Sequence, residues 1–240
     1  MEGIIDIHTH ILPGVDDGAA GKEEARRMLE IAAEDGITGI IVTPHYYPGR
    51  YTMPVHKIRA AYDQLLERNQ DILQKISVYL GSEVMYYSGC TVDLDTKVIY
   101  SMASGRYVLI EFPPSARCDE IRRAVSRMVA RGYLPVLAHI ERYAVMKDPA
   151  EAERLIDMGA YIQLNAGSVM GRYGYQAKRL CRELLRQELV HFIASDAHDV
   201  TRRKPELSKC AAYVGRKFGE DYARTLFYDN AEKLIQNKII

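Results

Sequence analysis

GIIDIHTHILPGVDDG, residues 3–18, joins a short apolar run to two histidines and a pair of aspartates. The β-branched residues at 4–8 predict a strand. In a strand, residues i and i+2 point to the same side, so His8 and His10 can present both imidazoles to one point in space. Two imidazoles directed at one point are typical of a metal site. The stretch therefore predicts a strand that ends in metal ligands.

Six more apolar, β-branched runs follow, at residues 39–43, 76–80, 107–112, 134–139, 160–165 and 191–195. Each is separated from the last by enough residues for a crossover helix. Strands that are nearly all apolar are typical of a parallel sheet covered on both faces. Seven βα units in a row predict an α/β fold and favour a closed or nearly closed barrel over an open sheet.

Helix signals lie between these runs. Residues 23–36 place alanines, Met28 and Leu29 on one helical stripe and end at a glycine. In residues 148–159, Asp148 is the expected N-cap, Glu151 closes a capping box and Gly159 ends the helix. No linker or break in composition divides the chain, so we expect one domain over residues 1–240.

Residues 116–132 are rich in arginine but carry a helical apolar stripe, formed by Ile121, Ala124, Val125, Met128 and Val129. A solvated helix face explains the arginines better than a nucleic-acid or membrane patch does. A docking patch for an acidic, tyrosine-rich tail is the alternative.

Composition limits the class of protein. The 240 residues contain 32 Lys and Arg against 32 Asp and Glu, so no net field recruits nucleic acid. We find neither a secretory signal nor an apolar run long enough to span a bilayer, and we expect a cytoplasmic protein. The four cysteines form no C-x-x-C pair and are expected to be reduced.

Histidines and acids gather at the predicted strand ends. In a parallel barrel all carboxyl ends of strands lie on one face, so residues scattered over 190 positions would converge on one pocket. A lone histidine at a strand end is more often structural, but residues of this kind at six of seven strand ends favour a metal centre. The candidates are His8, His10, Asp17, His45, Glu83, Glu111, His139, Asp196 and His198.

Five imidazoles and four carboxylates exceed the ligands that one ion takes, which indicates two or three divalent ions. The absence of cysteine from the set favours Mn, Fe, Zn or Mg. Such centres generate hydroxide at neutral pH and stabilise both oxygens of an in-line displacement. Hydrolysis of a phosphate ester is the chemistry that this pattern predicts.

The motifs DIHTHILPGVDDGA, VTPHY, GSEV, LIEFP, LAHIERY and SDAHD resemble those of the PHP (polymerase and histidinol phosphatase) superfamily. Three features narrow the resemblance: the DDG after HxH, the spacing of histidine and arginine in HIER, and the compact length. In these features the chain is similar to the metal-dependent bacterial protein tyrosine phosphatases of capsule and exopolysaccharide operons. The resemblance spans Ile5 to about Pro205.

This resemblance implies a distorted, TIM-like (β/α)7 barrel with a trinuclear site, usually of manganese or iron. The implied substrate is phosphotyrosine on a membrane-associated tyrosine autokinase. By position, the implied ligand sets are His8, His10, Glu83 and Asp196 for one ion, Glu83, Glu111 and His139 for a second, and Asp17, His45 and His198 for a third. The family's phosphate-binding arginines match Arg142 and Arg203.

Two positions depart from the family, which commonly has proline in place of Ile140 and asparagine in place of Asp199. Asp199 would lie beside the anion site, where it weakens phosphate binding or donates a proton. Arg202 is the alternative to Arg203 as the second phosphate-binding arginine.

The loop at residues 45–54 is a candidate lip of the pocket. Tyr46, Tyr47 and Tyr51 can stack on an aromatic substrate, and Arg50 can meet nearby acids. A tyrosine-rich surface turn is the equally good alternative.

One motif misleads. Cys210 and Arg216 have the C-x5-R spacing of cysteine-dependent phosphatases, but the stretch has a helical pattern, whereas a phosphate cradle needs a loop of free N–H groups. We expect Cys210 to be packed.

Three other functions remain open. The same site would suit a phosphatase for a small ester such as histidinol phosphate. A nuclease would need a basic groove, which the zero net charge does not favour. A metal-stabilised interaction module without activity would have no need for Arg142 and Arg203.

Overall fold

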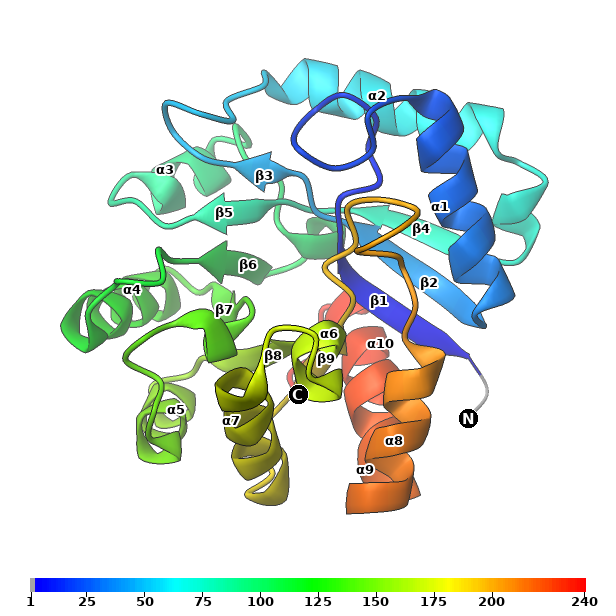
Figure 1. Cartoon of the computed structure of the whole chain (residues 1–240). Coiled ribbons are helices and arrows are strands. Elements are labelled where there is room, and N and C mark those ends of the chain that lie inside the picture. The colour runs from blue at the N-terminus through cyan, green and yellow to red at the C-terminus, as the bar shows by residue number, and fades with distance from the viewer. Residues whose placement is uncertain (1–2) are drawn as a thin grey trace.

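Parallel strands from all seven expected runs lie in two adjoining sheets that together curl round the middle of the molecule (Figure 1). The structure, a computed structural model, describes residues 3–240. Its strands are β1 (Ile4–Thr9), β2 (Ile37–Val42), β3 (His45–Tyr46), β4 (Ser77–Leu80), β5 (Glu83–Met85), β6 (Tyr107–Glu111), β7 (Leu134–Leu137), β8 (Tyr161–Asn165) and β9 (Phe192–Ala194). The α/β class and the parallel sheet are confirmed.

Two of the expected strands, at 39–43 and 76–80, are each followed after a short gap by a second strand that was not expected. One sheet has the order β1-β2-β4 and the other the order β3-β5-β6-β7-β8-β9. β3 follows β2 after two residues, and β5 follows β4 after Gly81 and Ser82. Backbone hydrogen bonds continue across both gaps, from Gly81 N to Val42 O (2.8 Å) and from Glu83 N to Pro44 O (3.1 Å). β2 with β3, and β4 with β5, therefore each follow the course of one strand.

The two free edges of the sheet meet beside the expected site. Ala197, just after β9, forms an isolated parallel bridge with Thr9 of β1. His10 N donates to Ala197 O (2.8 Å), and Asp196 N donates to His8 O (3.0 Å). The backbone that carries the first and the last candidate ligands is thereby joined directly.

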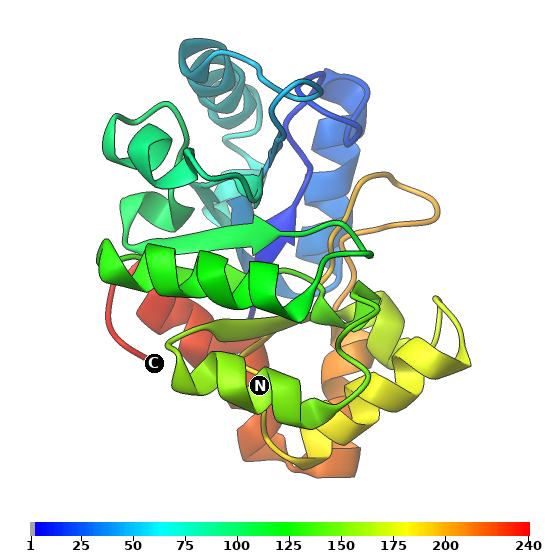
Figure 2. The ribbon, with the colours of Figure 1, turned by 90° about the vertical axis from the view of Figure 1, so that its left-hand side faces the viewer.

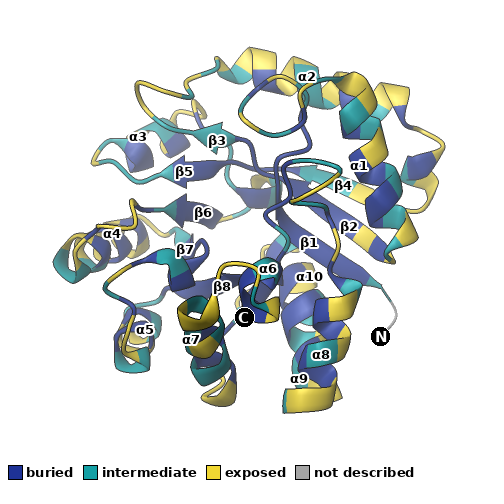
Figure 3. Ribbon diagram, in the orientation of Figure 1, coloured by how far each residue is buried: buried dark blue, intermediate teal, exposed yellow. Residues whose placement is uncertain are grey.

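Helices surround the sheet, with their exposed residues on the outward side (Figures 1 and 3). They are α1 (Lys22–Glu34), α2 (Val55–Arg68), α3 (Cys90–Asp95), α4 (Cys118–Ala130), α5 (Pro149–Asp157), α6 (Ala166–Met170), α7 (Tyr175–Arg186), α8 (Ser208–Phe218), α9 (Glu220–Arg224) and α10 (Asn230–Ile235). Shorter helical turns are η1 (Ile72–Gln74), η2 (Met102–Ser104), η3 (Ile140–Arg142) and η4 (Thr225–Asp229).

Alternate residues of most of the strands enter two different apolar clusters. In β6, Val108 and Ile110 pack with the surrounding helices, whereas Tyr107 and Leu109 belong to the cluster inside the curl. Leu234 of α10 belongs to the inner cluster as well. Burial of one such large apolar side chain contributes about 1.5–3 kcal/mol. Apolar packing thus occupies both faces of the strands and leaves their carboxyl ends for polar residues.

The structure confirms one of three expectations about the helices and contradicts the other two. Asp148 does cap α5, since its carboxylate accepts from Ala150 N at 3.0 Å. The expected capping box is wrong, because the Glu151 carboxylate pairs instead with the Arg122 guanidinium. Val129 was expected in the buried stripe of α4, but it lies near the end of the helix and is 39% exposed.

The cysteine expectations are confirmed. All four cysteines are free thiols, and Cys210 lies buried in α8, whose helical backbone extends through Arg216. Burial raises the pKa of the Cys210 thiol to about 12, so it is a poor nucleophile. Among residues 3–240, no helix has the length and apolar character needed to cross a membrane.

Candidate metal centre

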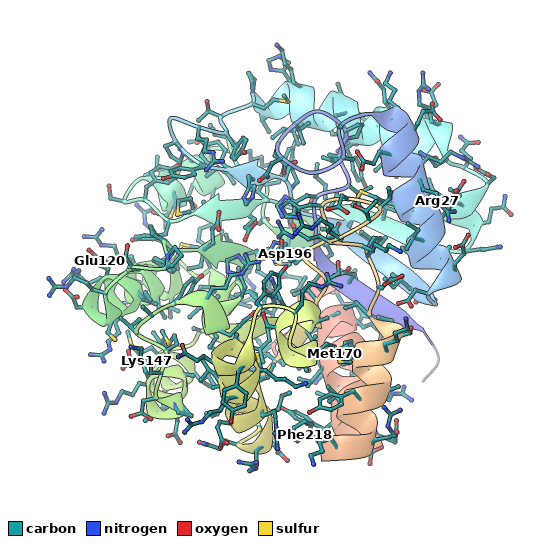
Figure 4. All side chains as sticks on the ribbon, in the orientation of Figure 1. Arg27, Glu120, Lys147, Met170, Asp196 and Phe218 are labelled. Atoms are coloured by element: carbon teal, nitrogen blue, oxygen red, sulfur yellow. The ribbon has the colours of Figure 1, made fainter. Side chains whose placement is uncertain are left out.

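All nine predicted ligands lie together at the carboxyl ends of the strands, around Asp196 at the centre of Figure 4. They come from six of the seven strand courses. His8 belongs to β1, His10 and Asp17 follow it, His45 begins β3, Glu83 begins β5, Glu111 ends β6, His139 follows β7, and Asp196 and His198 follow β9. The predicted convergence is therefore present in the structure.

One group of four has the spacing of ligands to a single ion. Glu83 Oε2 lies 3.1 Å from His8 Nε2 and 3.2 Å from His10 Nε2. Asp196 Oδ1 lies 3.4 and 3.5 Å from the same two nitrogens. Ligand atoms bonded at about 2.0–2.2 Å to one tetrahedral or octahedral ion are roughly 3–3.5 Å apart. This set is the one that the family resemblance implies for the first ion.

The tautomers of two histidines test whether a cation fits. His10 Nδ1 donates to the Asp16 carboxylate (2.8 Å), and His8 Nδ1 faces Gln163 Oε1 at 3.3 Å. When both protons are on Nδ1, the two Nε2 lone pairs face each other at 3.2 Å. Glu83 Oε2, beside them, is buried and has no hydrogen-bond partner. Two lone pairs and an unsatisfied carboxylate oxygen fit a divalent cation.

Protons compete with metal at this point. Burial by itself lowers the pKa of His10, but Asp16, then Asp196 and Glu83, outweigh burial and raise it well above its ordinary value. Burial and the neighbouring His10 lower the pKa of His198 to about 3, so His198 is neutral and has a lone pair to offer. Ligand histidines must be neutral at the coordinating nitrogen, so metal binding here weakens as the pH falls.

Two further groups adjoin the first. His45 Nδ1 lies 3.1 Å from Glu83 Oε2 and 3.2 Å from Glu111 Oε1. His45 Nε2 lies 3.4 Å from Asp17 Oδ1, with His198 and His10 in the same group. His139 Nε2 is 2.8 Å from Glu83 Oε1. The second group differs from the implied set, because it contains His45 and not His139 beside Glu83 and Glu111. The third group contains His10 in addition to the implied residues.

The backbone is strained at two candidate ligands. His139 and Asp196 have φ of 35° and 53°, in the left-handed region that residues with a Cβ rarely adopt. Each such residue costs about 1–3 kcal/mol and is found mostly at functional sites. At both positions the chain has just left its strand, β7 for His139 and β9 for Asp196.

Both candidate arginines point into the site. Arg203 Nη2 lies 2.7 Å and Arg142 Nη2 3.2 Å from Asp196 Oδ2. They line a pocket of about 230 Å³ together with Asp17, His45, Glu83, Glu111, His139, Asp196 and His198. Arg202 is exposed and does not line this pocket. The geometry therefore favours Arg203 over Arg202 as a contact for an anion.

Asp199 does not face the pocket. Its Oδ1 accepts from the backbone N–H groups of Thr201 (2.6 Å), Arg202 (2.5 Å) and Arg203 (3.2 Å). Burial is outweighed by these bonds, which lower the pKa of Asp199 to about 2. The carboxylate shapes the turn that presents Arg203, and its low pKa argues against the expected role as a proton donor.

The loop at residues 45–54 supplies the rim of the pocket. Tyr47, Arg50 and Tyr51 line the pocket, and reciprocal backbone bonds of 2.8 Å join Tyr47 to Tyr51. The Tyr51 ring stacks on His45 at 5.3 Å. Arg50 lies over the Tyr51 ring rather than beside an acid, and Tyr46 packs near Tyr87. Only part of this loop therefore faces the pocket.

Three residues with a supporting role were missed from the sequence. Asp16 fixes His10 and also accepts from His45 N (2.9 Å). Gln163 Oε1 accepts from His139 N (2.8 Å), and Asn165 Nδ2 donates to Asp196 Oδ2 (2.7 Å). Gln163 and Asn165 could have been recognised from the sequence, because they are polar residues at positions i and i+2 of the otherwise apolar run 160–165.

Comparison with known proteins agrees with this site. The family described as "Capsular polysaccharide synthesis, CpsB/CapC" matches residues 4–236. The tyrosine-protein phosphatase CpsB of Streptococcus pneumoniae is 33% identical, over 99% of this chain and 100% of the relative. The tyrosine-protein phosphatase YwqE of Bacillus subtilis is 35% identical, over 99% and 93%.

A solved structure is similar over the same length. It comes from a study of YwqE from Bacillus subtilis and CpsB from Streptococcus pneumoniae, described as unique metal-dependent tyrosine phosphatases. The TM-score is 0.90 at 36% identity, with 99% of this chain and 96% of that chain covered. The chain belongs to the CpsB/CapC family.

Proposed function

We propose that this protein is a metal-dependent protein tyrosine phosphatase. The observation that carries the proposal is the meeting of nine histidines and carboxylates in one cluster, seven of which line a single pocket together with two arginines. Relatives of nearly the same length that share about a third of the residues are named tyrosine-protein phosphatases. The site suits a phosphate monoester, because cations and guanidinium groups both bind phosphoryl oxygens.

The cofactor is proposed to be two or three divalent ions, most simply Mn, with Fe, Zn and Mg as alternatives. The first ion would be held by His8, His10, Glu83 and Asp196, the second by Glu83, Glu111 and His139 with His45 nearby, and the third by Asp17, His45 and His198. When bound, such ions lower the pKa of water and neutralise the charge of phosphoryl oxygens. Asp16 and Gln163 hold His10 and His8 so that Nε2 faces inward.

Arg142 and Arg203 bind the non-bridging oxygens of the phosphoryl group and stabilise the charge that they carry during transfer. Both guanidinium groups already point to Asp196 Oδ2. The leaving phenol of tyrosine has a pKa near 10, so it needs less help from a general acid than an alkoxide does. A cysteine nucleophile has no place in this proposal, since none of the four cysteines lines the pocket and Cys210 is 2% exposed in α8.

Substrate contacts are proposed for Tyr47, Arg50 and Tyr51, which line the pocket beside His45. Aromatic rings at the rim suit the ring of phosphotyrosine. Asp199 was expected among these contacts, but its bonds to three backbone N–H groups suit a structural role. The partner is proposed to be the tail of a membrane-associated tyrosine autokinase that regulates capsule or exopolysaccharide synthesis. The reaction then takes place in the cytoplasm, where the kinase has ATP.

We also infer that the sheet is best described as a distorted, TIM-like (β/α)7 barrel within a single domain. The supporting observations are the course of β2 into β3, that of β4 into β5, and the bridge from Thr9 to Ala197. Counting each broken strand once leaves seven strands in parallel order.

The test compares three substrates with the manganese-loaded protein: a phosphotyrosine peptide, a phosphoserine peptide and histidinol phosphate. We expect turnover largely confined to phosphotyrosine, loss of turnover in EDTA, and a strong loss in Arg142→Ala. Turnover of histidinol phosphate alone would indicate a small-molecule phosphatase. Absence of turnover with metal bound would indicate an interaction module.

A further inference from the structure

Arg142 has two anchors of different kinds. Its Nη2 lies 3.2 Å from Asp196 Oδ2, and its Cζ lies 5.2 Å from the centre of the Tyr173 ring. The same Asp196 oxygen is also contacted by Arg203 and by Asn165 Nδ2, each at 2.7 Å. Because Arg142 makes the longest of these three contacts, the carboxylate alone orients it poorly. The Tyr173 ring is the second support for its guanidinium.

The loop that carries Tyr173 is shaped by glycines. It joins α6 to α7, and Gly171 and Gly174 have φ of 94° and 96°, which residues with a Cβ rarely adopt. A Cβ at Gly167 would lie 3.0 Å from Tyr173 Cε2, so the absence of a side chain there leaves room for the ring. Arg172 N donates to Gly167 O at 2.8 Å and ties the loop down.

Figure 2 shows this loop, in yellow, projecting on the same side of the molecule as the orange loop that contains Arg203. Tyr173 nevertheless remains 42% exposed. A large aromatic side chain held beside a site and open to solvent is available both to Arg142 and to a ligand that enters the pocket.

We propose that Tyr173 is a positioning residue, whose ring holds Arg142 in the orientation that binds phosphoryl oxygens. The inference rests on the phosphatase function proposed above. A ring face attracts the guanidinium without accepting its N–H groups, so these donors stay free for phosphate. A carboxylate in the same place would neutralise the positive charge. A long side chain such as arginine otherwise loses much rotamer freedom when a ligand fixes it.

Because the ring and not the hydroxyl supports Arg142, two substitutions of Tyr173 should have different effects. Tyr173→Phe keeps an aromatic face, whereas Tyr173→Leu keeps an apolar side chain without one. Tyr175→Leu is the matched control, because Tyr175 is a nearby tyrosine at the start of α7 and is 78% exposed. Each variant is made in the full chain and loaded with manganese.

Four quantities are measured: the dissociation constant of inorganic phosphate by calorimetry, kcat/KM for a phosphotyrosine peptide, the manganese content, and the midpoint of thermal unfolding. In Tyr173→Leu we expect phosphate binding and kcat/KM to weaken about 5- to 20-fold. We expect Tyr173→Phe and Tyr175→Leu to stay within about twofold of the wild type. Manganese content and the unfolding midpoint should not change.

A double-mutant cycle tests whether Tyr173 acts through Arg142. Adding Tyr173→Leu to Arg142→Ala should have no further effect on phosphate binding. The proposal is overturned if Tyr173→Leu binds phosphate as tightly as Tyr173→Phe does, if its effect persists without Arg142, or if its loss follows a fall in manganese content. Phosphate binding is measured without turnover, so an inactive wild type would count against the phosphatase function alone.

Discussion

The two ends of the curled sheet satisfy their polar atoms in different ways. At the amino ends of the strands, the Tyr107 and Tyr161 rings lie 5.2 Å apart, and His191 meets Tyr161 edge-on at 5.1 Å. Tyr107 Oη donates to Lys238 O at 2.7 Å, and His191 Nδ1 accepts from Ile162 N at 3.1 Å. Every polar atom named here has a protein partner.

At the carboxyl ends, imidazoles and carboxylates crowd together instead. Glu83 Oε2 is buried without a hydrogen-bond partner, although three imidazole nitrogens lie within 3.2 Å of it. His139 and Asp196 are held in left-handed backbone conformations. The polar groups of the amino end are satisfied within the protein and serve stability, whereas those of the carboxyl end are the ones that we propose to bind cations and to serve chemistry.

The largest effect is expected from Glu83→Gln. A neutral amide would bind the proposed cations far more weakly than the carboxylate does, so we expect loss of most bound metal and a fall in phosphotyrosine hydrolysis of about 10³-fold or more. Metal content and turnover are measured on the same sample. Glu141→Gln is the matched control, since Glu141 is another carboxyl that is 7% exposed and follows β7. Equal losses in both variants would contradict the special role of Glu83.

The next largest effect concerns the arginines. Arg203→Ala should lower kcat/KM about 10²-fold, because it removes a donor that stabilises charge in the transition state. The neighbouring Arg202 is exposed, so Arg202→Ala should leave the rate within about twofold of the wild type. A greater loss in Arg202→Ala than in Arg203→Ala would reverse our assignment.

A smaller effect is expected from a residue that supports a ligand. Asp16→Asn weakens the bond that fixes the tautomer of His10, and should lower metal affinity about 10- to 100-fold without unfolding the protein. Metal titration monitored by calorimetry gives the affinity. Restored activity at high manganese would confirm that the carboxylate acts on metal binding, and unchanged affinity would show that Asp16 is not needed to orient His10.

At the opposite end, His191 should change stability and not activity. Burial lowers the pKa of His191 from 6.5 to about 4. Between these two pH values the histidine is therefore protonated in the unfolded chain and neutral in the folded protein. The stabilisation is present above pH 6.5 and is lost as the pH falls toward 4, by about 2 kcal/mol between pH 7 and pH 5. We expect His191→Asn, whose amide oxygen can accept from Ile162 N, to lose this part of the pH dependence.

Urea unfolding at both pH values measures this difference. Turnover of His191→Asn at pH 7 should equal that of the wild type, and His56→Asn, at an exposed histidine, is the control. An unchanged pH dependence in His191→Asn would show that His191 is not the group responsible.

The strands and the candidate ligands were predictable from the sequence because both depend on local pattern. Apolar β-branched runs indicate strands that are buried on both faces, and the parallel arrangement then brings the carboxyl ends of these strands together. The breaks after Val42 and Leu80 were not predictable, because β3 has only two residues and shows no periodicity. Gln163 contacts His8 across 155 positions, so only the closed sheet reveals that pair.

Features that depend on exact geometry were also missed. Val129 fits the apolar period of α4 but lies near the end of the helix, where no neighbour covers it fully. Glu151 has the spacing of a capping box, but Arg122 of the adjacent helix offers its carboxylate a charged partner. In both cases the tertiary surroundings outweighed a local preference.

Titration of manganese into the metal-free protein shows whether the crowded carboxyl end is a metal centre for phosphotyrosine hydrolysis. Bound ions per chain and turnover of a phosphotyrosine peptide are measured at each step. We expect turnover to be absent without metal, to rise with occupancy to a plateau at two or three ions per chain, and to be lost again when EDTA is added. Full turnover in the metal-free protein, or saturation with ions without any turnover, would contradict it.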